Sequence, residues 1–207
     1  MALTILVTGF GPFPGAPFNP TTPLVKRLAR LRRPALADVR VVPHVFPTSY
    51  AAVDRELPQL IAAHKPDALL MLGLAPRARS LRIETRARNA LALRADVGGA
   101  APRGRAIATG KPSALAMPAP ARRLLAAARA GRVPAALSSD AGQYLCNYLC
   151  WQAAQAARKG LRIAAFVHVP NVHRKTLPQG RKRHFTLEDL TRAGGHLLAE
   201  IAAAARR

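Results

Sequence analysis

The 207-residue sequence is poor in cysteine, in acidic residues and in aromatic residues, and it lacks long apolar runs. Its two cysteines, Cys146 and Cys150, lie four residues apart on one helical pattern, so a disulfide between them would be strained. No apolar run approaches the roughly 18 residues that a membrane-spanning helix needs. Residues 1–7 enter a strand pattern without a basic leader, so we expect no signal peptide. Reduced cysteines and these absences predict a cytoplasmic protein with no membrane partner.

The scarcity of acids leaves a large positive charge. There are 32 Lys and Arg residues against 10 Asp and Glu residues, which gives a formal net charge of +22. Such a charge attracts nucleic acid non-specifically. The arginines are nevertheless spread along the chain, the densest run is 181–183, and no zinc-finger or RNA-binding signature accompanies them. We therefore expect no specific nucleic-acid partner, and a basic nucleic-acid-binding protein remains the minor alternative.

Apolar or β-branched runs alternate with helical patterns along the chain. The runs predict strands at 4–8, 39–46, 66–73 and 161–170, and the periodic segments predict helices at 21–33, 49–64, 122–130, 145–159 and from 186 onward. Pro43 places the second strand at an edge or a bulge. The alternation predicts an α/β fold, a single-domain three-layer sandwich over residues 1–207, with a mostly parallel or mixed sheet and helices on both faces.

Three segments have no clear periodicity. Residues 74–99 are irregular and rich in arginine, and Glu84 is the only acid between Asp67 and Asp96. Residues 98–120 carry many glycines and prolines, which predicts an extended loop or a mobile flap. The polar, basic segment 171–183 also reads as a mobile loop.

Cys146 lies where a strand-like segment passes into a helix. Ser138, Ser139 and Asp140 are good helix caps, so Cys146 is expected near the helix N-terminus. The positive end of the helix dipole favours a thiolate there, as a nucleophilic cysteine requires. The alternative is a small buried side chain, which remains our interpretation of Cys150.

A cysteine nucleophile needs a base, and the base benefits from an acceptor that fixes its tautomer. Among the six histidines, His168 lies at the end of a buried strand pattern, with His44 as the second candidate. Glu84 is the best-placed acid. Because ligands bind beyond the carboxyl ends of strands in α/β sheets, Cys146, His168, Glu84 and the two phenylalanines after the first strand are expected at one rim.

Several segments resemble the pyroglutamyl-peptidase I family of cysteine exopeptidases, also called pyrrolidone-carboxylate peptidases. The resemblance covers nearly the whole chain and is carried by residues 6–13 (LVTGFGPF), 19–20, 66–75, 137–147 (LSSDAGQYLCN) and 166–170 (FVHVP). The cysteine segment matches the family pattern throughout. The family uses a Glu, a Cys and a His, and Glu84, Cys146 and His168 stand at the matching positions.

The resemblance implies hydrolysis of an N-terminal pyroglutamyl residue from peptides through a thioester, with no cofactor or metal, and a homo-oligomer such as a dimer or tetramer. Pyroglutamate is a flat, neutral lactam, so its pocket should have aromatic walls and a few backbone hydrogen bonds. The expected substrate-binding residues are Phe10, Phe13, Asn19, Tyr144 and Leu145.

The glutamate segment departs from the family pattern. The family usually has Ser or Thr two residues before the Glu, then a basic and an apolar residue after it, whereas this chain has Arg82, Thr85 and Arg86. This change places the positive charges of Arg82 and Arg86 two residues before and two residues after Glu84. It leaves a second function open, a related amidase or a weakened homologue that binds lactam-capped peptides with little turnover.

Overall fold

The structure, a computed structural model, describes residues 2–158, 160–172 and 185–207, so most of the loop predicted at 171–183 lies outside the described residues. The chain runs in the order β1 (Leu3–Phe10), α1 (Thr21–Ala29), η1 (Pro34–Leu36), β2 (Val39–Phe46), α2 (Tyr50–His64), β3 (Ala68–Leu74), β4 (Leu81–Glu84), β5 (Arg86–Arg88), β6 (Ala114–Ala116), α3 (Ala121–Ala130), β7 (Ala135–Ser138), α4 (Leu145–Ala157), β8 (Ile163–Val169) and α5 (Leu187–Ala205).

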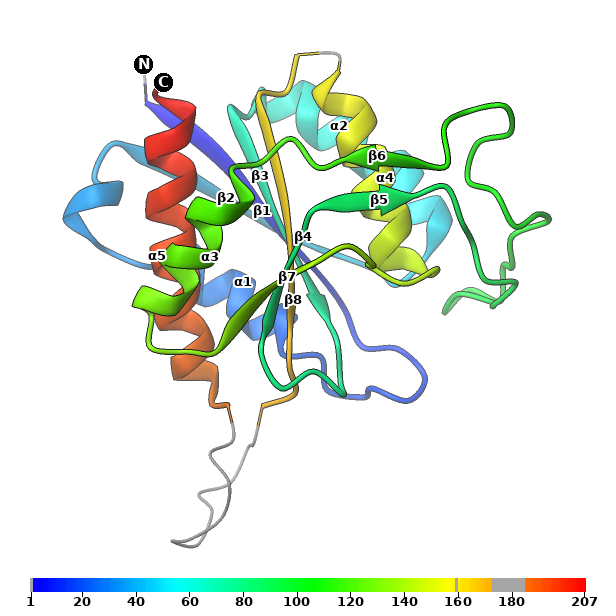
Figure 1. Cartoon of the computed structure of the whole chain (residues 1–207), viewed down its shortest axis with the longest axis horizontal. Coiled ribbons are helices and arrows are strands. Elements are labelled where there is room, and N and C mark those ends of the chain that lie inside the picture. The colour runs from blue at the N-terminus through cyan, green and yellow to red at the C-terminus, as the bar shows by residue number, and fades with distance from the viewer. Residues whose placement is uncertain (1, 159, 173–184) are drawn as a thin grey trace, which may run out of the picture.

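Six of the strands form one mixed sheet in the order β2-β1-β3-β8-β4-β7 (Figure 1). Strands β2, β1, β3 and β8 run parallel, while β4 pairs antiparallel with β8 and parallel with β7. Every residue of β3 and β8 is buried, as expected for central strands covered on both faces. Strand β2 contains Pro43 and lies at the sheet edge, as predicted.

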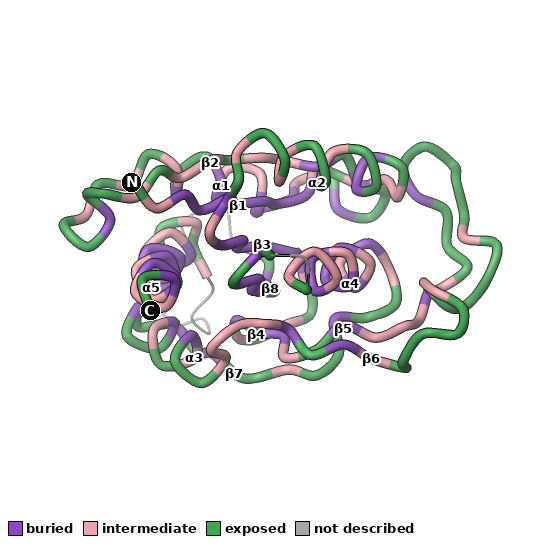
Figure 2. The backbone as a smooth tube through the Cα atoms, turned by 90° about the horizontal axis from the view of Figure 1, so that it is seen from above, coloured by how far each residue is buried: buried purple, intermediate pink, exposed green. Residues whose placement is uncertain are grey.

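Helices cover both faces of the sheet, which confirms the predicted three-layer α/β fold (Figure 2). On one face, α1, α3 and α5 bury a cluster that includes Leu24, Leu124 and Leu198. On the other face, α2, α4 and the two-stranded β5–β6 ribbon bury a cluster that includes Trp151 and Phe166. No helix in the described ranges is both long enough and apolar enough to span a membrane.

The ends of several helices differ from the prediction. Helix α1 has Pro20 as its N-cap and ends at Ala29, four residues before the predicted end at 33. Helix α5 begins where it was predicted, with a capping box: the Thr186 hydroxyl accepts from the Asp189 N–H, and the Asp189 carboxylate accepts from the Thr186 N–H.

The arginine-rich segment after β3 is more regular than predicted. It forms β4 and β5, and the glycine-rich segment after it contributes β6, which pairs with β5. Charged side chains at Arg82, Arg86 and Arg88 mask the apolar alternation that would have revealed these strands.

Candidate active site

The register of three neighbouring strands brings His168 and Glu84 together. On β8, Phe166 belongs to the cluster under α4 while Val167 packs on the opposite face, so His168 faces α4. Glu84 lies opposite Phe166 across the antiparallel β4–β8 pair. Its Oε1 is 2.8 Å from Nδ1 of His168, and both side chains are buried. Since a carboxylate only accepts, Nδ1 carries the proton and Nε2 is left for the reaction.

Glu84 reaches this place differently from the prediction. We expected it beyond the carboxyl end of a strand, at the same rim as Phe10 and His168. Strand β4 instead runs against β8, so Glu84 enters the site from within the sheet. The pairing of acid and base predicted from the sequence is nonetheless present.

Cys146 is the second residue of α4 and is half-buried. Its sulfur occupies space that the missing side chain of Gly73 leaves open, since a Cβ atom at Gly73 would lie only 2.9 Å from Sγ. Gly73 pairs directly with His168 across the parallel β3–β8 ladder. A glycine at this position therefore allows the sulfur to lie beside the histidine.

The electrostatics of His168 reflect these neighbours. Burial by itself would lower the pKa of the imidazole, but the charge and hydrogen bond of Cys146 and those of Glu84 outweigh it and raise the pKa to about 9. At neutral pH His168 therefore holds its proton as an imidazolium beside the cysteine. A positive charge beside a cysteine favours the thiolate form that nucleophilic attack requires.

Cys150 lies one turn further along α4 and is completely buried. Burial raises the pKa of its thiol well above the usual value, and the charges of Cys146 and Glu84 raise it further. Cys150 thus remains a protonated core residue, as the sequence suggested.

The N-terminus of α4 has no side-chain cap. Its N-cap residue is Tyr144, so the predicted capping by Ser138, Ser139 or Asp140 is wrong. The carboxylate of Asp140 accepts instead from the N–H of Gly142 in a tight turn. The first N–H groups of the helix, including that of Cys146, are therefore left available to an external oxygen.

The last residue of β1 and the loop after it provide three of the predicted substrate-binding residues. Phe10 is buried against Phe46, with ring centroids 6.0 Å apart, whereas Phe13 is half-exposed. Asn19 is buried, donating from Nδ2 to the Gly11 carbonyl and accepting at Oδ1 from the Thr21 N–H. Phe10 and Asn19 thus support the shape of the loop, and Phe13 is the more accessible ring.

The two remaining predicted residues precede and begin α4. Leu145 is buried in the core, while the half-exposed Tyr144 contacts residues 94 and 95 at the end of the arginine-rich segment 74–99. Its hydroxyl donates to the Ala95 carbonyl, and the Arg94 guanidinium lies 4.9 Å from the ring centroid. Asp96 anchors the same segment by accepting from the N–H of Tyr50 at the start of α2.

Asn147 carries a positioning role that the sequence did not reveal. Its buried side chain accepts from the Arg88 N–H and donates to the carbonyls of Arg88 and Ala90. It ties the end of β5 to the first turn of α4, next to Cys146. The only signal in the sequence was a polar residue within an apolar helical face.

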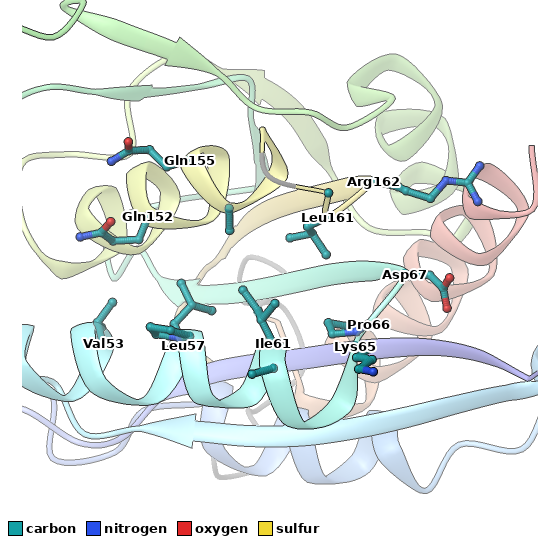
Figure 3. A pocket seen from close by; sticks show the side chains of 14 residues that line it. Val53, Leu57, Ile61, Lys65, Pro66, Asp67, Gln152, Gln155, Leu161 and Arg162 are labelled. Atoms are coloured by element: carbon teal, nitrogen blue, oxygen red, sulfur yellow. The ribbon is translucent and has the colours of Figure 1, made fainter.

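A groove of about 650 Å³ between α2 and α4 lies away from these residues (Figure 3). Lys65 to Asp67 and Gly160 to Arg162 line it, just before β3 and β8 begin. It is therefore at the opposite end of the sheet from Gly73 and His168. Among the described residues, no group of three or more His, Cys, Asp or Glu side chains is placed to hold a metal ion.

Comparison with known proteins agrees with this arrangement. The family model described as pyroglutamyl peptidase matches residues 3–193. The chain belongs to the pyroglutamyl peptidase family. It is 32% identical to the pyrrolidone-carboxylate peptidase of Pyrococcus furiosus over 82% of each chain. It is 33% identical to pyrrolidone-carboxylate peptidase 1 of Ralstonia nicotianae, covering 81% of this chain and 78% of that one.

Solved structures of pyroglutamyl peptidases share the fold. The Bacillus amyloliquefaciens pyroglutamyl peptidase I structure is 28% identical, covers 97% of both chains and superposes with a TM-score of 0.84. The pyrrolidone carboxyl peptidase structure from Thermococcus litoralis is 28% identical, covers 99% of this chain and 96% of that one, and has a TM-score of 0.86. The family resemblance predicted from the sequence is therefore confirmed.

Proposed function

We propose that this protein is a cysteine exopeptidase that hydrolyses the bond after an N-terminal pyroglutamyl (5-oxoproline) residue of a peptide. The observation that carries the proposal is the buried Glu84–His168 pair beside Cys146, in a chain of the pyroglutamyl peptidase family. Cys146 is the nucleophile, His168 the acid and base, and Glu84 the group that orients and charges the histidine.

In the first half of the reaction, the Cys146 thiolate attacks the carbonyl carbon that joins pyroglutamate to the next residue. The S–C bond forms, and the oxygen becomes an oxyanion that the free N–H groups at the start of α4 can stabilise. The His168 imidazolium then gives its proton to the leaving nitrogen, and the C–N bond breaks. A thioester of Cys146 and a shortened peptide result.

In the second half, neutral His168 takes a proton from water, whose oxygen attacks the thioester. The C–S bond breaks, the thiolate re-forms, and pyroglutamate is released. Glu84 stabilises the imidazolium in both halves, because its Oε1 accepts from Nδ1. Each step uses only protein groups and water.

The lactam ring is proposed to lie between Phe13 and Tyr144, the two more exposed rings at this rim. Phe10 and Asn19 hold the loop that carries Phe13, and Leu145 anchors the start of α4. A neutral, aromatic-walled pocket favours a lactam over a free, charged amino terminus.

The unusual neighbours of Glu84 are compatible with full activity. The hydroxyl of Thr85 donates to the Ser138 carbonyl, and Nε of Arg86 donates to the Ser139 carbonyl. Both side chains thus support the segment leading to Cys146, while Oε1 of Glu84 remains on His168. This geometry favours a working hydrolase over the alternative of a weakened homologue.

We further propose that residues 1–207 form one catalytic domain, which acts on pyroglutamyl peptides and has no specific nucleic-acid partner. The family resemblance supports a homo-oligomer, a dimer or a tetramer, and two unpaired cysteines support a cytoplasmic location.

A turnover assay tests the proposal. Reduced protein should release the fluorophore from pyroglutamyl-aminomethylcoumarin, and Cys146→Ala or iodoacetamide should abolish the release. Cys150→Ala is the matched control, because it removes the other thiol, which is buried and has a raised pKa. A rapid burst of thioester with no steady-state release would support the weakened homologue, and no reaction above blank would end the enzyme assignment.

A further inference from the structure

A basic pocket lies beside the proposed active site, on the loop between β3 and β4. It has a volume of about 580 Å³ and is lined by residues 75–80 together with Arg82. Three of its lining residues are arginines, Arg77, Arg79 and Arg82, and all three are exposed. No acidic residue lines it.

Strand register places Arg82 next to His168. Leu81 and Ile83 pack in the cluster under α3 and α5, so Arg82 and Glu84 project from the opposite face of β4, toward the α4 side. Arg82 pairs directly with His168 across the antiparallel β4–β8 ladder. Side chains paired in this way have Cβ atoms about 4.5–5.5 Å apart. Arg82, which lines the pocket, is therefore the cross-strand neighbour of His168.

The chemistry of the reaction decides which part of the substrate meets this pocket. His168 gives its proton to the leaving nitrogen, so the residue after pyroglutamate must lie on the histidine side of Cys146. Glu84 occupies one side of His168 along β4, and Arg82 occupies the other. The leaving residue is thus directed toward Arg82.

The guanidinium groups of the three pocket arginines are not engaged by any neighbouring side chain among the described residues. Within the part of the chain that the structure describes, no hydrogen bond or ion pair engages the guanidinium of Arg77, Arg79 or Arg82. Asp140 is already paired with Arg88 at 3.2 Å. Burial opposes the charge of Asp140, but the Gly142 N–H and Arg88 lower its pKa overall, and Arg82 adds only a longer-range attraction.

We propose that this pocket is a subsite for a carboxylate on the residue after pyroglutamate, with Arg82 as the specificity-determining side chain. The inference rests on the proposed function, because only a leaving amino acid would place a carboxylate there. Two sources share this chemistry: an Asp or Glu side chain, and the free α-carboxylate of a pyroglutamyl dipeptide.

The test compares matched substrates by the amine that they release. Pyroglutamyl-Glu-amide against pyroglutamyl-Gln-amide isolates a side-chain carboxylate, and pyroglutamyl-Ala against pyroglutamyl-Ala-amide isolates a terminal one. One or two exposed ion pairs contribute about 0.2–1 kcal/mol each, so kcat/KM should be higher for the acidic member of at least one pair by about 1.4- to 30-fold. Added salt should reduce the preference.

Variants connect the preference to the pocket. Arg82→Thr, which suits a strand, should remove most of the preference by lowering kcat/KM for the acidic member of a responding pair toward that of its neutral partner. Arg82→Glu should reverse it, favouring pyroglutamyl-Lys-amide over pyroglutamyl-Gln-amide. Arg122→Thr is the matched control, since it removes one exposed positive charge from α3 on the opposite face.

The outcomes separate this inference from the proposed function. Hydrolysis of the neutral amides with equal kcat/KM for both matched pairs would overturn the carboxylate subsite and leave the peptidase intact. A preference that Arg82→Thr does not change would also overturn it, because the general +22 charge would then be the cause. Failure to hydrolyse any substrate would instead refute the proposed function.

Discussion

Replacing Gly73 with alanine should disable the active site without unfolding the protein. An added Cβ would lie 2.6 Å from Cζ of Phe166, 2.8 Å from its Cε1 and 2.9 Å from the sulfur of Cys146. Strand β3 cannot move away, because it is hydrogen-bonded to β1 on one side and β8 on the other. The ring and the sulfur must shift instead.

The size of the effect follows from this crowding. Inserting a methyl group into a packed site costs about 1–3 kcal/mol, which for a chain of this length lowers the melting temperature by roughly 2–12 °C. A sulfur displaced by about 1 Å from its reacting position loses on the order of 10²-fold in rate. We therefore expect Gly73→Ala to remain folded at 25 °C with kcat/KM reduced by about 10²-fold or more.

Three measurements check this prediction: hydrolysis of pyroglutamyl-aminomethylcoumarin, the rate of alkylation of Cys146 by iodoacetamide, and thermal unfolding. Gly104→Ala is the matched control, since a Cβ at Gly104 meets nothing within 4 Å. Activity of Gly73→Ala within about threefold of the parent would refute the placement of the sulfur against this glycine. A lower melting temperature with unchanged activity would assign Gly73 to packing alone.

Three further predictions concern charged groups around the site. Glu84→Gln removes the carboxylate that helps raise the pKa of His168, so kcat/KM should fall by about 10²–10⁴-fold, whereas the exposed Glu188→Gln should not change it. The pKa of His168 is raised from 6.5 to about 9 in the fold, so its contribution to the unfolding free energy is complete below about pH 6.5 and is lost as the pH rises through about 9. Urea unfolding across this range should show the loss, and Cys146→Ala, which removes the main cause of the increase, should reduce it. Asp96→Ala deletes the acceptor for three backbone N–H groups. We expect it to lower the free energy of unfolding by about 0.5–2 kcal/mol and to make proteolysis within residues 92–112 faster. Unchanged cleavage would contradict the anchoring role of Asp96.

Much of the fold could be predicted because its central strands carry plain local signals. The predicted strands at 66–73 and 161–170 contain the uninterrupted apolar stretches 68–72 and 163–167, and the structure buries every residue of β3 and β8. His168 was conspicuous because a histidine within such a run needs a reason to be there. Pro43 marked an edge strand because it lacks a backbone donor.

The features that were missed depend on contacts distant in sequence. The direction of β4 is set by its pairing with β8, and no local pattern around Glu84 records it. The capping residues were misassigned because Asp140 is used in a turn with Gly142, and a good cap and a good turn residue are the same residue types. The role of Gly73 is steric, and a glycine at a strand end looks like any other.

The sheet order has a consequence for how the protein is made. Strands β3 and β4 follow each other along the chain, yet β8, which is synthesised almost last, lies between them. Until β8 emerges from the ribosome, both neighbours keep an unpaired apolar edge, which is a site for association with other chains. The same late strand carries His168. A nascent or truncated chain that ends before Ile163 therefore lacks both the strand that joins β3 to β4 and the general base. Hydrolysis can begin only after this last strand has been inserted.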